Sequence, residues 1–163
     1  MKRNLAVAMF VATLFATLNA GPTPARAMEG GGCSVASVAG DYGFTYNGTA
    51  ILPTGTVPVA AVGNYSTDAA GNFVGTEINS LGGTAAFQTI LGNITVNRDC
   101  SATLVAKVYQ AGTLVRTSFV HLQYDNNARD TRIIFQKVVL PDGSTLPVVI
   151  TGDSRRVSQG HGD

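Results

Sequence analysis

Short turns rich in Gly, Pro, Asn and Asp recur along the chain, and they constrain its fold more than any other feature. The connections suit antiparallel neighbours and are too short for crossover helices. In NYSTDAAGNFVGT (64–76), β-forming residues flank a polar centre where Gly71 suits the positive φ of a tight reversal. The pattern predicts eight strands, at residues 42–51, 56–66, 72–79, 84–96, 102–110, 113–123, 131–139 and 146–156.

The predicted fold class is all-β, because no segment of ten or more residues has helical periodicity. Strands such as 103–110 (TLVAKVYQ) and 131–139 (TRIIFQKVV) carry apolar residues on both faces. A closed meander explains this pattern if one face fills or lines the interior while the outer face keeps residues of high β propensity. Closure also removes exposed strand edges. We expect an eight-stranded antiparallel up-and-down barrel, with a two-sheet β-sandwich as the alternative.

The first 27 residues have the form of a secretory signal peptide. Lys2 and Arg3 precede an apolar run of 14 residues (5–18), shorter than the roughly 20 residues that span a bilayer, and a cleavage site ends at Ala27. We expect an exported protein, periplasmic or extracellular, with no integral membrane span. The expected organisation is a signal peptide at 1–27, a flexible segment at 28–39, one β-barrel domain at 40–157 and a disordered tail at 158–163.

Charge and cysteine content narrow the classes of partner and cofactor. Removing Lys2, Arg3 and Arg26 with the signal peptide leaves eight basic and ten acidic side chains, so the chain gives no reason to expect nucleic acid as a partner. Cys33 and Cys100 form an even pair in an exported chain, which predicts a disulfide. Cysteines and histidines never fall at metal-ligand spacing, so we expect no metal and no cofactor. The sequence indicates no particular oligomeric state.

Four stretches resemble a family of small exported bacterial proteins: GDYGFTYNGT (40–49), VGNYSTDAAGNFVGTE (62–77), GNITVNRDCSATL (92–104) and VVITGDSRRV (148–157). The resemblance covers nearly all of the chain after the signal peptide and implies a barrel of the calycin or allene-oxide-cyclase-like type. These motifs are turn and strand-end patterns, so they specify a fold and carry no ligand with it. The absence of Trp disfavours lipocalins and avidins.

Most carboxylates have a structural explanation. Five of them fall in predicted turns, where hydrogen bonds to the backbone account for them: Asp68, Asp99, Asp125, Asp130 and Asp142. Glu77 differs, because it shares a strand face with Phe73 and Gly75. If that face points inward, the carboxylate could bind a ligand or act as a base; if it points outward, Glu77 is an ordinary solvated side chain.

His121 lies in mid-strand and shares a face with Phe119 and Gln123. A lone His at such a position is more often a hydrogen-bonded structural residue than a general base. No catalytic motif accompanies it, so we expect no catalytic constellation. The candidates for a ligand pocket are Glu77, His121, Tyr46 and Phe119.

Three functions are compatible with these observations. The first is an exported, non-enzymatic barrel that binds a small apolar ligand or a partner protein. The second is a cyclase-like or isomerase-like enzyme whose cavity shapes a hydrophobic substrate while Glu77 or His121 assists. The third is a structural envelope or surface protein with a filled barrel. A solid interior would favour the third, an apolar cavity the first, and a cavity with Glu77 or His121 buried at its floor the second.

Overall fold

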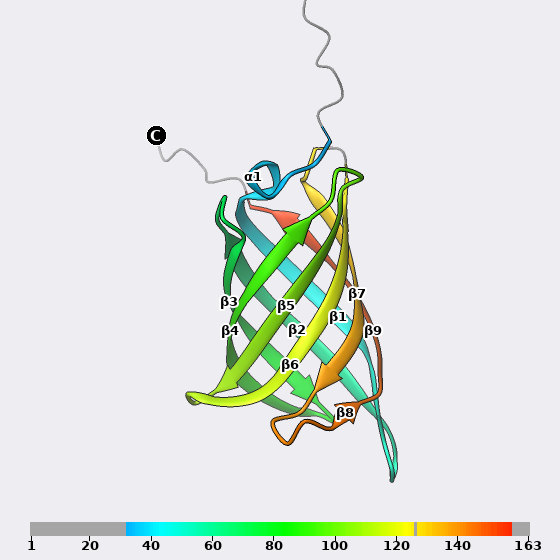
Figure 1. Cartoon of the computed structure of the whole chain (residues 1–163). Helices are drawn as coiled ribbons and strands as arrows, with labels where there is room; N and C mark the ends of the chain where they lie inside the picture. The colour runs from blue at the N-terminus through cyan, green and yellow to red at the C-terminus, as the bar shows by residue number, and fades with distance from the viewer. Residues whose placement is uncertain (1–31, 126, 158–163) are drawn as a thin grey trace, which may run out of the picture.

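The computed structural model describes residues 32–125 and 127–157, so the predicted signal peptide (1–27) and tail (158–163) lie outside the described residues. Within the described part, eight strands form a closed antiparallel barrel (Figure 1). They are β1 (Gly40–Leu52), β2 (Gly55–Thr67), β3 (Asn72–Leu81), β4 (Thr84–Val96), β5 (Ser101–Gln110), β6 (Thr113–Tyr124), β7 (Asp130–Val139) and β9 (Val148–Arg156), with the two-residue β8 (Thr145–Leu146) beside β7.

The strand order is that of an up-and-down meander. Strands consecutive in the chain are hydrogen-bonded neighbours from β1 to β7, and β9 pairs with both β7 and β1, which closes the ring. A sandwich would leave two separate sheets, whereas every barrel strand here has a partner on each side. The predicted barrel is therefore confirmed, including the closed β-barrel that the family resemblance implied; its calycin-like character stays a prediction.

The last strand differs from the prediction. The other predicted strands end within two residues of the observed bounds, but 146–156 is interrupted at Pro147, which separates β8 from β9. Proline has no N–H to continue a hydrogen-bonded ladder. Its carbonyl oxygen still accepts from the Ile51 N–H at 2.8 Å, so the segment remains attached to β1.

The turn chemistry agrees with the sequence at most positions. Gly71 has a φ of 88°, as expected. Backbone N–H groups donate to the carboxylates of Asp68, Asp99, Asp125 and Asp142. Asp130 does not accept such a bond among the described contacts; its Oδ1 instead pairs with Arg155 Nε at 2.8 Å, on the exposed surface. The prediction for Asp130 was wrong because a cross-strand cation lies opposite it, on β9.

Aromatic rings fill the interior near one end of the barrel. Tyr42 stacks on Tyr65 with ring centroids 4.9 Å apart, and Tyr65 stacks on Phe73 at 4.5 Å. Tyr124 meets Tyr42 edge-on at 6.2 Å. Burial raises the pKa of Tyr65 to about 12 and also raises the pKa values of Tyr42 and Tyr124. This half of the interior is a packed core.

The short helix α1 (Val35–Val38) covers the same end of the barrel (Figure 1). It lies in the segment 28–39, which was expected to be flexible. A helix of four residues is too short to show helical periodicity in the sequence. Val38 is completely buried. The Tyr42 hydroxyl lies 2.9 Å from the Val38 carbonyl oxygen and 3.0 Å from that of Ala128, and Arg156 Nη2 donates to the Ala39 carbonyl at 2.7 Å. Among the described residues, no helix is long and apolar enough to cross a membrane.

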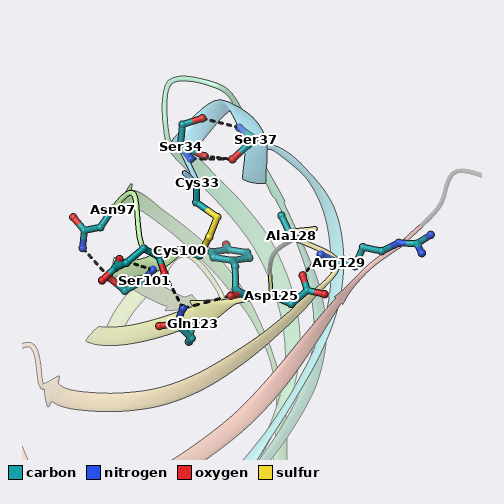
Figure 2. The surroundings of a disulfide bond; sticks show 12 residues. Cys33, Ser34, Ser37, Asn97, Cys100, Ser101, Gln123, Asp125, Ala128 and Arg129 are labelled. Atoms are coloured by element: carbon teal, nitrogen blue, oxygen red, sulfur yellow. Dashed lines mark hydrogen bonds between the residues drawn. A yellow bond between two sulfur atoms is a disulfide. The ribbon is translucent and has the colours of Figure 1, made fainter. Parts of the chain in front are cut away.

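The predicted disulfide between Cys33 and Cys100 is present and fastens α1 to the barrel rim (Figure 2). Cys100 lies in the turn between β4 and β5, and the Cys33 N–H donates to the Arg98 carbonyl in the same turn at 3.2 Å. The covalent link and the buried Val38 together close this end.

Candidate functional site

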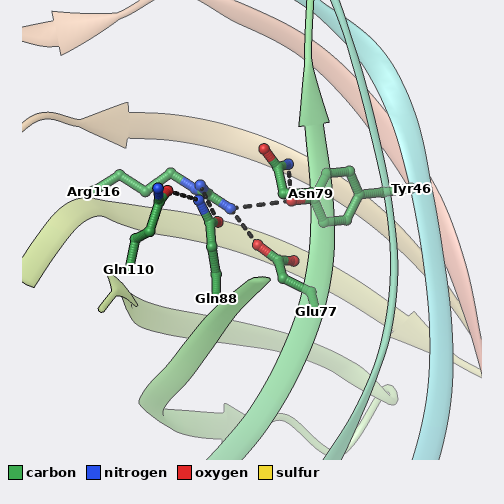
Figure 3. A network of polar contacts seen from close by, with 6 residues as sticks. All are labelled: Tyr46, Glu77, Asn79, Gln88, Gln110 and Arg116. Carbon is green, nitrogen blue, oxygen red and sulfur yellow. Dashed lines mark hydrogen bonds and ion pairs between the residues drawn. The ribbon is translucent and has the colours of Figure 1, made fainter. Parts of the chain in front are cut away.

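Six polar side chains contact one another inside the barrel, toward the end at β8 and away from α1 (Figure 1), and Figure 3 shows them from close by. We call this group the polar cluster. Each member shares an inward strand face with buried apolar residues, as Gln88 does with Ile90 on β4. The strands β1, β3, β4, β5 and β6 therefore bring together residues far apart in the chain: Tyr46, Glu77, Asn79, Gln88, Gln110 and Arg116.

Arg116 is the centre of the polar cluster. Its Nη2 donates to Glu77 Oε1 at 2.5 Å and to the Tyr46 hydroxyl at 3.1 Å, and its Nη1 donates to Gln88 Oε1 at 2.7 Å. The Glu77 side chain is 1% exposed and that of Arg116 is 16% exposed. The guanidinium from β6 thus reaches across the interior to strands that are not its neighbours, and it forms an ion pair almost entirely removed from water.

The remaining contacts extend the cluster on both sides of Arg116. Asn79 Nδ2 donates to the Tyr46 hydroxyl at 3.0 Å, and Gln88 Nε2 donates to Gln110 Oε1 at 3.2 Å. Burial raises the pKa of Tyr46, and the Glu77 carboxylate raises it further, against the opposing charge of Arg116. The phenol is therefore neutral at physiological pH and acts as a hydrogen-bonding group, not as an anion.

A β-bulge helps to place the cation. Opposite β5, Arg116 pairs with Val108 and Leu114 pairs with Tyr109, so Val115 is an extra residue on β6. Bulges bend a strand locally and re-aim its side chains. As a result the adjacent residues Val115 and Arg116 both line the same pocket.

A pocket of about 490 Å³ opens at this end of the barrel, and we call it the mouth pocket. Its polar groups come from Thr84 and from every member of the polar cluster except Glu77, which lines the inner cavity described below. Its walls are apolar and are formed by Ala50, Val59, Leu81, Ala86, Val115, Phe135, Val138, Leu140, Leu146, Val148 and Ile150. Several of these residues belong to the β7–β9 connection and the β3–β4 hairpin, so the mouth is built from strand ends and turns.

A smaller inner cavity of about 50 Å³ lies between the polar cluster and the aromatic core. Tyr46, Arg116 and Phe135 line both this cavity and the mouth pocket, so they form the partition between the two spaces. Ser118 also lines the inner cavity; its hydroxyl is buried and has no hydrogen-bond partner among the described residues. Buried hydroxyls normally have a hydrogen-bond partner, so Ser118 is an exception in a mostly apolar cavity.

Two of the four candidate pocket residues lie inside the barrel. Glu77 and Tyr46 point inward, with exposed fractions of 2% and 6%. The structure brings them together through Arg116. The reading of Glu77 as a solvated outward side chain is excluded, because Phe73 on the same strand face lies in the core.

His121 and Phe119 lie on the outer wall, so their assignment to the pocket was wrong. Val120 and Leu122, on either side of His121, are buried in the core. Because successive side chains of a strand point to opposite faces, Phe119 and His121 point outward. Phe119 instead lies beneath Lys137, whose Nζ is 5.8 Å from the ring centroid.

Sequence reasoning missed Asn79, Gln88, Gln110 and Arg116. A signal existed for all four of them, since each lies in the alternation of the strand face that points into the barrel. Gln88 precedes Ile90, Gln110 follows Val108, and Asn79 follows Glu77 at spacing two. Arg116 gave the same signal from its C-terminal side, since it precedes the buried Ser118 and Val120 at spacings of two and four, whereas the bulge at Val115 interrupts the alternation only toward the start of β6.

Other features of the described residues carry less chemistry. No group of three or more His, Cys, Asp or Glu side chains there could hold a metal ion. A hollow of about 900 Å³ lies over β1, β6, β7 and β9, but most of the side chains around it are exposed, including Asp130, Arg132 and Arg155. Exposed charges of this kind are already solvated by water.

Comparisons with known proteins give no relative of known activity. No protein-family model matches the chain, and no curated protein matches it. A redesigned β-barrel, mFAP1, solved bound to DFHBI, is similar in structure with a TM-score of 0.49 and 14% sequence identity, over 76% of this chain and 98% of that one. We therefore infer function from the geometry of the mouth pocket alone.

Proposed function

We propose that this protein binds a small, largely apolar ligand in the mouth pocket. The observation that carries the proposal is the pocket itself, about 490 Å³ with apolar walls, where Arg116 and four neutral members of the polar cluster supply the polar groups. Pockets for small molecules commonly measure about 300 to 1,000 Å³, have apolar walls and contain a few placed polar groups. The mouth of a small closed barrel is a recurrent position for such a pocket.

The polar cluster suits the role of orienting a bound molecule. Arg116 is fixed by Glu77, Tyr46 and Gln88, so its position does not depend on the ligand. A preorganised hydrogen-bonding group loses little conformational entropy when a ligand binds. The apolar walls would supply most of the affinity, and the cluster would select the orientation.

We also propose that the protein acts outside the cytoplasm and without catalysis. The first part rests on the sequence of residues 1–27, whose basic start, short apolar run and cleavage motif are typical of an exported protein. The second part is supported by Glu77, whose carboxylate is engaged by a guanidinium at 2.5 Å and would be poorly placed to accept a proton from a substrate.

An enzyme of the cyclase or isomerase type is the second candidate. It is favoured by one observation, that Glu77 lies buried where it lines the inner cavity. Incubating the protein and its Glu77→Gln variant with hydrophobic extracts of the host, followed by mass analysis, separates the two functions. Compounds consumed by the wild type and spared by the variant would support catalysis, whereas compounds retained and released unchanged would support binding.

A fluorescence titration with the neutral probe N-phenyl-1-naphthylamine tests binding. Ala86 lines the mouth pocket, and the adjacent Ala85 is exposed on the outer face of β4. We expect Ala86→Trp to fill the pocket and weaken probe binding at least about tenfold, since apolar contact area supplies the affinity. The matched control Ala85→Trp should bind as the wild type does. Equal binding by both variants would place the probe elsewhere and contradict the proposal.

A further inference from the structure

We infer that the mouth pocket selects neutral ligands that carry a hydrogen-bond acceptor, such as a ketone, over carboxylates of the same shape, and that Glu77 sets this preference. The inference rests on the proposed binding function and adds the chemical class of the ligand. It starts from the charges that a ligand would meet. Among the described residues that line the mouth pocket, Arg116 is the one charged side chain.

Arg116 has hydrogen-bond donors to spare. A guanidinium carries five N–H groups. Three are engaged by Glu77, Tyr46 and Gln88, which leaves the Nε hydrogen and one Nη1 hydrogen without an acceptor among the described residues. Because Arg116 also borders the mouth pocket, an acceptor atom at the inner end of a ligand would find these donors.

The charge of Arg116 is nevertheless already neutralised. Glu77 Oε1 lies 2.5 Å from Nη2, and its side chain is almost completely buried. A ligand carboxylate that contacted Arg116 would therefore place a second anion near Glu77, behind apolar walls where solvent screens the repulsion only weakly. It would also lose its own hydration on entry. A ketone oxygen accepts the same N–H groups without either penalty.

The other polar groups of the mouth do not supply a second positive charge. Both polar atoms of the Gln88 amide are engaged, since its Oε1 accepts from Arg116 and its Nε2 donates to Gln110. Asn79 donates one Nδ2 hydrogen to Tyr46, and its second Nδ2 hydrogen and its Oδ1 belong to an uncharged amide, which cannot replace a cation as a partner for a carboxylate. The pocket is thus polar enough to orient a ligand and too nearly neutral to favour an anion.

Two compounds of equal shape test the inference: 2-undecanone, and decanoate at pH 8, where the acid is ionised. Each is titrated against the purified protein by displacement of N-phenyl-1-naphthylamine. We expect the wild type to bind 2-undecanone at least about tenfold more tightly. In Glu77→Gln, where Arg116 keeps its charge, the ratio of the two dissociation constants should shift at least about tenfold toward decanoate. In Glu77→Gln with Arg116→Gln, that shift should disappear.

Asp130→Asn is the matched control, because it removes a carboxylate from the exposed pair with Arg155; the ratio should stay at the wild-type value. Equal affinity of the wild type for the two compounds would overturn the inference, as would an unchanged ratio in Glu77→Gln, while displacement of the probe would still support the proposed function. Failure of the wild type to bind the probe or either compound would overturn both the inference and the proposed function.

If Glu77→Gln does not fold, the affinity of the wild type for decanoate decides. That affinity should fall about tenfold for each pH unit between pH 6 and pH 8, because only the neutral acid would bind, and a constant affinity would show that the anion is accepted.

Discussion

Replacing Arg116 with Met should leave the Glu77 carboxylate buried without its cation. Methionine replaces the aliphatic stem of arginine and has no charge and no N–H donors. The Glu77 side chain is 1% exposed, so water cannot replace the lost guanidinium without rearrangement. Removing one partner of a buried ion pair costs about 3 to 5 kcal/mol. Because Arg116 borders the mouth and is itself 16% exposed, we expect the lower value, about 3 kcal/mol.

A double-mutant cycle separates this effect from simple loss of packing. Glu77→Met should also destabilise the protein, but less, because the partly exposed Arg116 can keep some hydration. The double variant Arg116→Met with Glu77→Met contains no buried charge. It should therefore be more stable than Arg116→Met alone, with a coupling free energy of at least about 2 kcal/mol between the two sites.

Urea unfolding followed by circular dichroism measures all four proteins, provided that the slope of the transition is unchanged. Arg155→Met is the control, because its pair with Asp130 is similar in distance but has exposed fractions of 81% and 55%; its unfolding midpoint should match the wild type. The reasoning is refuted if the double variant is less stable than Arg116→Met, since the floor of the mouth would then be solvated and the ion pair would not be a buried one.

Three further predictions concern the frame around the site. Replacing both Cys33 and Cys100 with Ala should lower the free energy of unfolding by about 4 kcal/mol, because cysteines 67 residues apart are no longer linked; urea unfolding measures it, and an unchanged midpoint would contradict it. Gly71→Val should cost on the order of 1 to 3 kcal/mol in the same assay, because φ is 88° and the new Cβ would lie 2.6 Å from the Ile94 carbonyl oxygen, whereas Ala70→Val should be neutral. The raised pKa of Tyr65, about 12, should make its contribution to stability complete below pH 10 and lost as the pH rises to 12; ultraviolet titration that showed every tyrosine ionised at pH 10 with the fold intact would refute this.

The strands were predictable because their limits are set locally. Turn residues such as Gly71 adopt a particular backbone conformation, and they separate β-forming segments that became strands of 9 to 13 residues. Closure of the sheet into a barrel could be predicted from the number of strands and from the apolar residues on both faces of those strands. The outer wall confirms that second feature: Val62, Ile78 and Phe87 lie opposite one another on β2, β3 and β4 and are about half exposed. The same feature made it hard to decide from sequence which face points inward.

The polar cluster was less predictable because it depends on contacts across the barrel. Arg116 and Glu77 are 39 residues apart on strands that are not paired, so the sequence around one of them does not indicate that it contacts the other. Glu77 was selected by its type and its strand face, Tyr46 was named as a pocket candidate without such an argument, and the structure places both inside. His121 was assigned to the strand face of Phe119 and Gln123, and the structure shows that the opposite face, with Val120 and Leu122, is the buried one.

The central claim is that a small apolar molecule binds in the mouth pocket. Nuclear magnetic resonance of the isotope-labelled protein, titrated with N-phenyl-1-naphthylamine, tests it most directly because each perturbed signal has a position in the barrel. The account predicts saturable shifts in the side-chain signals of Gln88, Gln110 and Arg116, which line the pocket. Shifts confined to the outward residues Ile78 and Phe87, or no shifts at all, would contradict it.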